Sequence, residues 1–290
     1  MGKVISVINM KGGVGKTTLS TGIADYISNH HEKHYKTLLI DVDPQFNATQ
    51  ALLDLYKEDK KKFDEEENFY NCEVKKNNKT IYTLFRSRTD LSQKISTPKS
   101  EDLIISLSDN LDILCGDLNL VLVNKSNDSS NLKKIANFIE DNGLLDKYDY
   151  IIIDCPPTLT IYTDSALMAS DFYIIPNRID RFSIIGINSL QSAVDMLIYS
   201  ERIKLKCLGI VYTMVNKNNS PKQEKLKNNF ESKDIINNID IFASSTSRYE
   251  NLQVGISGSI PTCYSGPMDE IEAISLEFLS KINNYESKDI

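Results

Sequence analysis

Short apolar runs alternate with amphipathic stretches along most of the 290-residue chain. Consecutive apolar positions are typical of strands buried on both faces of a parallel sheet, and apolar positions three or four apart indicate helices. We predict strands over residues 4–8, 37–42, 111–114, 150–154, 172–176 and 208–215. We predict helices over residues 16–28, 131–141, 162–169, 183–201, 221–230 and 267–281. This alternation predicts an α/β fold with a doubly wound, mostly parallel sheet flanked by helices.

One segment, residues 57–79, breaks the alternation because it is densely charged and has few apolar residues. Such a composition predicts a solvated insertion, either a loop or a surface helix. Neither an internal repeat nor a convincing linker divides the sequence. We therefore expect residues 1–290 to form a single domain with this charged insertion.

The overall composition narrows the class of protein. The chain has 33 Lys and Arg against 40 Asp and Glu residues, a formal net charge of −7. This balance argues against a protein whose whole surface binds nucleic acid, but it leaves room for a local basic patch. The five cysteines are scattered and form no C-x-x-C pair, which argues against a zinc ribbon or a disulfide framework. Since no stretch approaches about 18 apolar residues, we expect a cytoplasmic protein and no membrane partner.

A glycine-rich run, K-G-G-V-G-K-T-T, lies between the first predicted strand and the first predicted helix. In this position backbone N–H groups can wrap around phosphates, and the helix N-terminus adds its positive end. The Lys16 amine is placed for the β- and γ-phosphates, and the Thr17 hydroxyl is placed for Mg²⁺. The predicted nucleotide-binding residues of the run are Gly12, Gly13, Val14, Gly15, Lys16, Thr17 and Thr18.

Three carboxylates follow two of the predicted strands. Asp41 and Asp43 belong to the segment D-V-D-P-Q, and Asp154 begins the segment D-C-P-P. The carboxyl ends of the strands are where an open α/β sheet forms its ligand crevice. We therefore expect these acids to lie beside the glycine-rich run.

The glycine-rich run departs from the standard G-x-x-x-x-G-K-[ST] pattern, because Met10 stands at the first glycine and a second lysine, Lys11, follows it. Together with D-x-D-P-Q and the strand I-I-I-D-C-P-P, it resembles the deviant Walker A signature of the ParA/MinD/Soj family of P-loop ATPases. The N-A-T sequence of residues 47–49 resembles the ParA/Soj branch. Three places depart from the family pattern: Phe46 replaces a glycine, residues 177–181 are more basic, and residues 244–264 match only loosely.

The resemblance implies an ATPase that binds ATP with Mg²⁺ and closes as a homodimer over two nucleotides. Lys11 would then reach the partner's phosphates, Asp43 would position the attacking water, and Lys16 completes the catalytic set. The implied magnesium residues are Thr17, Asp41 and Asp154. Asn216, at the end of a predicted strand, is a candidate for the adenine, although polar residues at strand ends also commonly form turns.

A ParA-type protein would bind DNA non-specifically on the nucleoid and drive plasmid or chromosome segregation with a ParB-like centromere-binding partner that stimulates hydrolysis. Five cationic residues form the candidate DNA patch: Lys217, Lys222, Lys225, Lys227 and Arg248. Clustered lysines can neutralise phosphates together. An ordinary charged helix explains the same pattern equally well.

The sequence fits two other branches of the family less well. A MinD-like ATPase that cycles on a membrane predicts a basic amphipathic C-terminal helix. Residues 281–290, K-I-N-N-Y-E-S-K-D-I, are instead polar and nearly neutral. A protein like the nitrogenase iron protein needs cysteines that share a cluster. Cys155 lies inside the D-C-P-P segment, so a buried inert thiol is the better interpretation.

Overall fold

The computed structural model describes residues 1–57, 68–86, 97–123, 129–180, 183–216, 221–254 and 258–288. Its centre is an eight-stranded sheet with the strand order β3-β4-β2-β5-β1-β6-β7-β8. Every neighbouring pair is parallel except the edge pair β3–β4, which is antiparallel. The strands are β1 Lys3–Val7, β2 Thr37–Asp41, β3 Ile105–Ser106, β4 Leu111–Leu114, β5 Tyr150–Asp154, β6 Phe172–Asn177, β7 Lys206–Val215 and β8 Ile241–Ser247.

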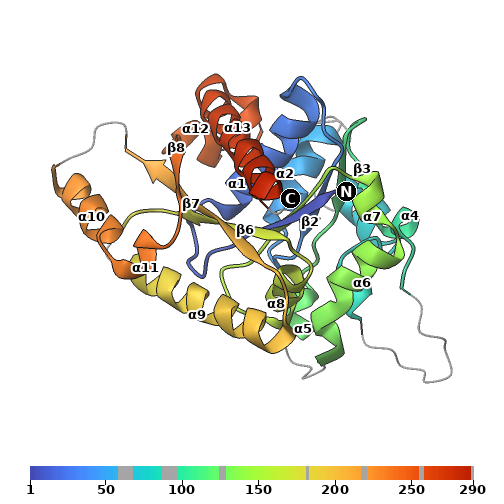
Figure 1. Cartoon of the computed structure of the whole chain (residues 1–290). Coiled ribbons are helices and arrows are strands. Elements are labelled where there is room, and N and C mark those ends of the chain that lie inside the picture. The colour runs from blue at the N-terminus through green and yellow to red at the C-terminus, as the bar shows by residue number, and fades with distance from the viewer. Residues whose placement is uncertain are drawn as a thin grey trace.

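Helices cover both faces of the sheet (Figure 1). The longer helices are α1 Lys16–Asp25, α2 Asn47–Tyr56, α6 Lys134–Asp141, α8 Ile161–Met168, α9 Ser183–Glu201, α10 Pro221–Glu231 and α13 Ser265–Lys288. Shorter helices are α3 Tyr82–Phe85, α4 Ser100–Leu103, α5 Leu120–Val123, α7 Leu144–Lys147, α11 Asp234–Asn237 and α12 Glu250–Val254. Two π-helices, Tyr26–His30 and Tyr70–Lys75, and two 3₁₀-helices, Ser129–Lys133 and Pro261–Cys263, complete the set in the described ranges.

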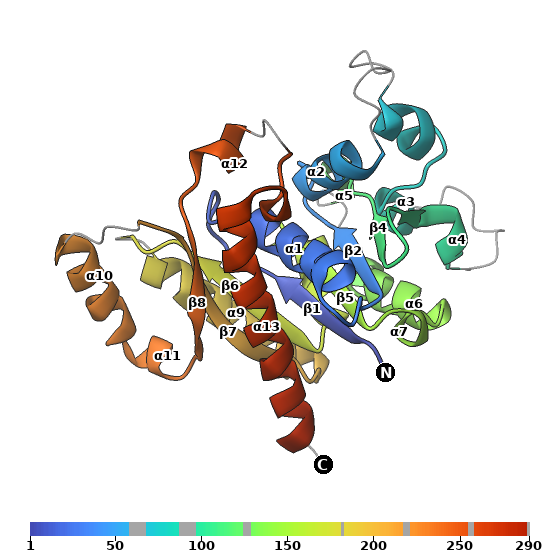
Figure 2. The same cartoon turned by 90° about the horizontal axis from the view of Figure 1, so that it is seen from above.

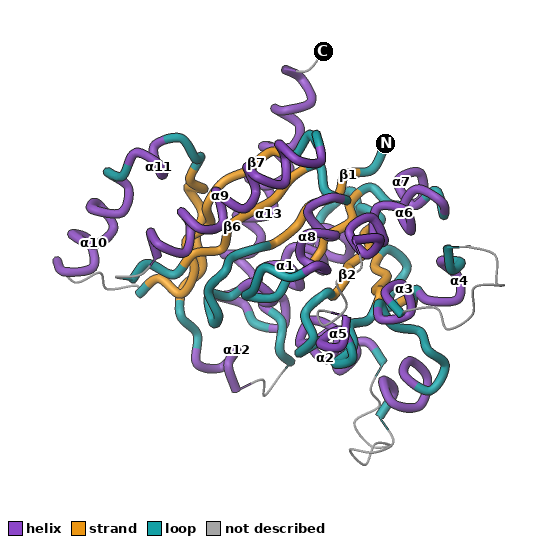
Figure 3. The backbone as a smooth tube through the Cα atoms, turned by 90° about the horizontal axis from the view of Figure 1, so that it is seen from below, coloured by secondary structure: helices purple, strands orange, loops and turns teal. Residues whose placement is uncertain are grey.

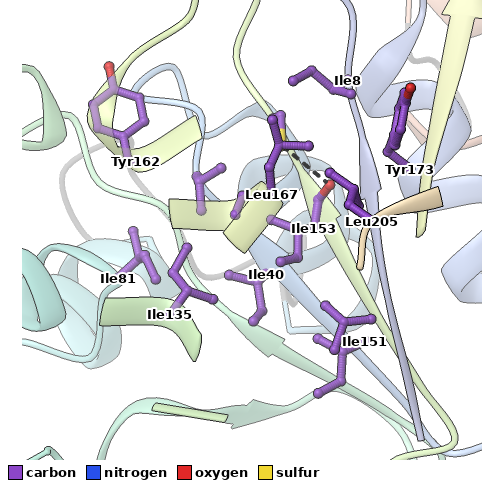
Figure 4. Packing of buried hydrophobic residues seen from close by; sticks show 14 of the residues in the cluster. Ile8, Ile40, Ile81, Ile135, Ile151, Ile153, Tyr162, Leu167, Tyr173 and Leu205 are labelled. Carbon is purple, nitrogen blue, oxygen red and sulfur yellow. Dashed lines mark hydrogen bonds between the residues drawn. The ribbon is translucent and has the colours of Figure 1, made fainter. Parts of the chain in front are cut away.

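The two faces of the sheet bury two separate hydrophobic clusters. Helices α1 and α13 cover one face (Figure 2), and α6, α8 and α9 cover the other (Figure 3). Side chains alternate along each strand, so in β5 Ile151 and Ile153 enter one cluster and Ile152 enters the other. Figure 4 shows Ile151 and Ile153 in the cluster that also contains Ile135 of α6 and Leu167 of α8. Burial on both faces explains why this strand is continuously apolar.

The β8 edge of the sheet is held by carboxylates of α13. Glu277 accepts hydrogen bonds from the backbone N–H groups of Ala243 and Ser244, each at 3.0 Å. Glu270 accepts one from the N–H of Ser247 at 2.7 Å. These bonds satisfy backbone donors that an edge strand would otherwise leave to solvent.

The predicted fold class is confirmed, and β4, β5 and α9 have the predicted bounds. The strand β8, the short strand β3 and the helix α2 were not predicted. The charged insertion is only partly solvated: residues 58–67 lie outside the described residues, but Tyr70 and Val74 are buried. In its described part the segment therefore packs against the domain, because these two side chains join the core on the α1 face.

Candidate functional site

The glycine-rich loop connects the end of β1 to the start of α1, as predicted. Gly13 and Gly15 have φ angles of +67° and +79°, in the left-handed region that favours glycine. A Cβ at Gly12 or Gly13 would meet nothing within 4 Å, so the outer side of the loop is open. The loop is fixed from below by Thr213 of β7, whose hydroxyl donates to the backbone oxygen of Val14 at 2.8 Å.

Lys16 folds back over this loop. Its side chain is 7% exposed, and Nζ donates a hydrogen bond to the backbone oxygen of Lys11 at 3.1 Å. Burial lowers the pKa of Lys16, while the carboxylates of Asp154 and Asp43 oppose that shift. The ammonium is thus held between the loop and two of the three predicted acids.

Asp154, at the end of β5, is the carboxylate closest to the start of α1. Its Oδ2 accepts a hydrogen bond from the Thr17 hydroxyl at 2.8 Å. Its Oδ1 is buried and has no hydrogen-bond partner within the described ranges. Burial raises the pKa of Asp154 to about 6, and the hydrogen bond from Thr17 opposes the rise. An unpartnered carboxylate oxygen beside a hydroxyl is a donor set suited to Mg²⁺, so these residues fit the implied metal.

Asp41 lies directly beside Asp154 in the register of β2 and β5. It is fully buried, and three protein donors already bind it: the N–H and hydroxyl of Thr49 at 2.9 and 2.8 Å, and the N–H of Asp43 at 3.1 Å. Burial, with the charge of Asp154, raises the pKa of Asp41 well above its usual value. Asp41 therefore anchors the loop that follows β2, and its place in the magnesium shell stays a prediction.

Asp43 follows β2 and lies near Lys16 and Asp154. Its side chain is 8% exposed, and Oδ1 accepts a hydrogen bond from the N–H of Gln45 at 2.9 Å. Its charge acts on both Lys16 and Asp154. The structure thus brings together Lys16, Thr17, Asp43 and Asp154, with the predicted Asp41 beside Asp154.

Lys11 points within its own chain. Its ammonium pairs with the carboxylate of Asp180, in the loop after β6. Its backbone N–H is held by Asn9 Oδ1 at 3.0 Å. Burial and the neighbouring charge of Arg178 lower the pKa of Lys11. The sequence did not identify Asp180 as the partner of this lysine.

Two pockets share three lining residues, which are Thr213 and Met214 of β7 and Arg248. The smaller, about 110 Å³, is also lined by Gly15 and Thr18 at the start of α1. The larger, about 400 Å³, lies toward α10 and is lined by Asn216. The candidate adenine residue therefore borders the pocket that is farther from α1.

The candidate DNA patch is only partly assembled. Lys222 and Lys225 are exposed on α10, whereas the Lys227 ammonium lies 3.7 Å from the Glu231 carboxylate and 5.2 Å from the ring centre of Tyr212. Lys227, Arg248 and Arg178 line the larger pocket. Lys217 lies outside the described residues.

Thr49 and Gly116 also belong to the site, and we did not predict them. The Thr49 hydroxyl donates to Asp41 and accepts a hydrogen bond from the N–H of Gly116 at 2.8 Å. Gly116 follows β4, whose carboxyl end lies at the same edge of the sheet. The C-G-D sequence after this strand is the signal that could have identified it.

Comparison with known proteins fits this geometry. A family profile described as an AAA domain matches residues 2–207, well over half of the chain. The sporulation initiation inhibitor protein Soj of Bacillus subtilis is 30% identical over 221 residues, which cover 74% of each chain. The chain belongs to the ParA/Soj family of P-loop ATPases.

Solved structures confirm the fold of this ParA/Soj family member. A plasmid partition protein of Borrelia burgdorferi superposes with a TM-score of 0.70 at 23% identity, covering 97% of this chain and 100% of its own. Cobyrinic acid a,c-diamide synthase of Mycobacterium smegmatis, solved with an ATP analogue and magnesium, gives a TM-score of 0.71 at 17% identity. That match covers 96% of this chain and 95% of the synthase. At these identities the two structures support the fold alone.

Proposed function

We propose that this protein is a partition ATPase of the ParA type, which hydrolyses ATP with Mg²⁺ and couples the reaction to DNA segregation. The observation that carries the proposal is the convergence of Lys16, Thr17, Asp43 and Asp154 at the carboxyl edge of the sheet. Phosphoryl transfer needs mainly alignment and charge neutralisation, and this group can supply both.

Each residue has a distinct role in the proposal. Backbone N–H groups of the loop and the Lys16 ammonium bind the phosphates. Thr17 and the unpartnered oxygen of Asp154 would hold the metal and its water. Mg²⁺, when bound, would offset the negative charge of the phosphates. Asp43 orients the attacking water, since its carboxylate lies close enough to Lys16 for the two charges to interact.

The proposal includes an ATP-dependent sandwich homodimer. The open space beside Gly12 and Gly13 would let two loops approach closely. Lys11 would leave the carboxylate of Asp180 and reach the phosphates bound by the partner. This exchange keeps the lysine paired with negative charge in both states, which limits the cost of burying it.

DNA binding in this proposal is non-specific and acts through the patch on α10 and Arg248. Three residues of the patch are exposed: Lys222, Lys225 and Arg248. Among the described residues none of the three forms a salt bridge, so each can reach a DNA phosphate directly. A ParB-like centromere-binding adaptor would stimulate hydrolysis, and the dimer would work in the cytoplasm on the nucleoid. The cargo would be a plasmid or a chromosome.

MinD-like cycling on a membrane is the weaker alternative. The apolar residues of α13, among them Ile271, Ile274 and Phe278, are buried against the sheet and α1, so they are not free to enter a bilayer. None of the helices in the described part of the chain has both the length and the apolar character needed to cross a membrane.

The test is a gel shift of non-specific duplex DNA with ATP or ADP at several salt concentrations. We expect retardation that requires ATP, weakens with salt and disappears in Lys16→Ala. ATP turnover without any retardation would contradict direct DNA binding. Binding to anionic liposomes in the same buffer would then favour the MinD-like alternative.

A further inference from the structure

Phe46 has a backbone conformation that favours glycine. Its φ and ψ angles are both 40°, in the left-handed region, directly after the segment that carries Asp43. Its N–H donates to the Asp43 backbone oxygen at 2.8 Å, so the strained residue closes the turn that places the Asp43 carboxylate. A bulky residue stays in this region only where its surroundings hold it there.

The ring of Tyr70 holds Phe46. The two rings are stacked with centroids 4.8 Å apart and an angle of 12° between their planes. Tyr70 belongs to the π-helix Tyr70–Lys75 in the charged insertion, and it is buried. Its hydroxyl donates to the backbone oxygen of Gly116 at 3.0 Å, which fixes the ring from the side of β4.

Gly116 closes a circuit of contacts that leads back to the site acids. A Cβ at this position would lie 2.6 Å from the Cβ of Phe46 and 3.0 Å from the Cγ of Asp41, so only glycine fits. The Gly116 N–H binds Thr49, Thr49 binds Asp41, and Asp41 accepts the N–H of Asp43. Tyr70 therefore contacts Phe46 on the loop that carries the site acids, and it is linked to Asp41 on the same loop through Gly116 and Thr49.

We propose that Tyr70 is a positioning residue for ATP hydrolysis: its ring clamps Phe46 in the left-handed conformation and thereby fixes the Asp43 carboxylate. The inference rests on the hydrolytic function proposed above. Through Tyr70, the charged insertion would then help to position the residue that orients the attacking water. A glycine at position 46 would adopt the same backbone without support, so Phe46 and Tyr70 act as one unit.

Steady-state ATP hydrolysis tests the clamp. We expect Tyr70→Ala to lower kcat by about 10- to 100-fold, because a small displacement of a positioned group is costly. The affinity for an ATP analogue should stay within about two-fold, since Tyr70 does not contact the glycine loop. Tyr70→Phe keeps the stack and should retain most of the activity. Tyr199→Ala, on an exposed tyrosine of α9, is the matched control.

A double-mutant cycle separates the clamp from general loss of stability. In a Phe46→Gly background the backbone needs no clamp, so adding Tyr70→Ala should change kcat by less than about two-fold. Independent losses that multiply in the double variant would overturn the proposal. Tyr70→Leu, which fills most of the volume, replaces Tyr70→Ala if the alanine variant does not fold.

Amide hydrogen exchange tests the same idea without any activity. The N–H groups of Gln45 and Phe46 both bind Asp43, so a released loop should exchange them at least about five-fold faster in Tyr70→Ala than in the wild type. Unchanged exchange would overturn the clamp whether or not the protein hydrolyses ATP. If Tyr70→Ala shows the faster exchange but the wild type does not hydrolyse ATP, the clamp is supported and only the proposed function is refuted.

Discussion

The nucleotide site and the cationic patch are built in opposite ways. The site gathers Lys16 from the start of α1, Asp43 from the loop after β2 and Asp154 from the end of β5. Each of these side chains is buried and bound by the protein. The patch consists of side chains on α10 and near β8, of which Lys222 and Lys225 are exposed. The fold therefore fixes the geometry of the first region, whereas the patch is a group of charged side chains on the surface.

Asp43→Ala is the sharpest test of the rigid region. We expect ATP hydrolysis to fall by about 10²- to 10⁴-fold, the range typical of a positioned acid–base group, while ATP binding is retained. Measured turnover and the dissociation constant of an ATP analogue check this. Asp109→Ala, on an exposed residue before β4, is the control. Full turnover by Asp43→Ala would remove Asp43 from the catalytic set.

Lys16→Ala is expected to weaken ATP binding by about 100-fold, since charge-assisted contacts to phosphate are the strong ones. Titration with a fluorescent ATP analogue measures the loss. Lys204→Ala removes an exposed lysine next to β7, at the opposite edge of the sheet, and should bind normally. Equal affinity in the two variants would contradict the position of the Lys16 ammonium over the loop.

Asp154→Asn tests how much the buried charge of Asp154 destabilises the folded protein. Because burial raises the pKa of Asp154 to about 6 from a usual value of 3.8, the folded protein holds its proton more tightly than the unfolded chain. Stability therefore falls as pH rises from about 4 to 6 and stays lower above it. At pH 7.5 without nucleotide, Asp154→Asn should increase the free energy of unfolding by up to about 3 kcal/mol.

Urea denaturation at pH 4.5 and pH 7.5 measures this effect, and the gain should shrink at the lower pH. The same variant should lose Mg²⁺-dependent hydrolysis, since an amide is a poorer magnesium ligand than a carboxylate. If Asp154→Asn is less stable than the wild type at pH 7.5, the charge of Asp154 does not destabilise the folded protein.

Single substitutions in the cationic patch should each change DNA affinity slightly, and their effects should add. We expect Lys222→Gln and Lys225→Gln each to lower DNA affinity by a few-fold and to reduce the salt slope by about 1. Fluorescence anisotropy at three salt concentrations measures both quantities, with Lys204→Gln as the control of equal charge. A loss of about 100-fold from one lysine would mean that the patch is built like the nucleotide site.

Sequence patterns predicted the parts of the fold that burial determines. The bounds of β5 follow from its unbroken apolar run. The glycine-rich run and the acids at the strand ends predicted residues that the structure brings close together, and their roles stay predictions. The strand β8 was missed because its sequence, I-F-A-S-S-T-S, has few apolar residues and it is stabilised by carboxylates of α13. The roles of Asp180, Thr49 and Gly116 depend on contacts between distant segments, which local patterns do not contain.

The glutamates of α13 also affect how copies of this protein can meet. A seven-residue strand with free N–H groups is a template on which another chain can add a strand, the route to aggregation and strand exchange. Glu270 and Glu277 occupy three of those donors, and their negative charge repels an approaching carbonyl edge. Growth of the sheet past β8 is therefore blocked, which leaves loop faces and helix surfaces for specific association.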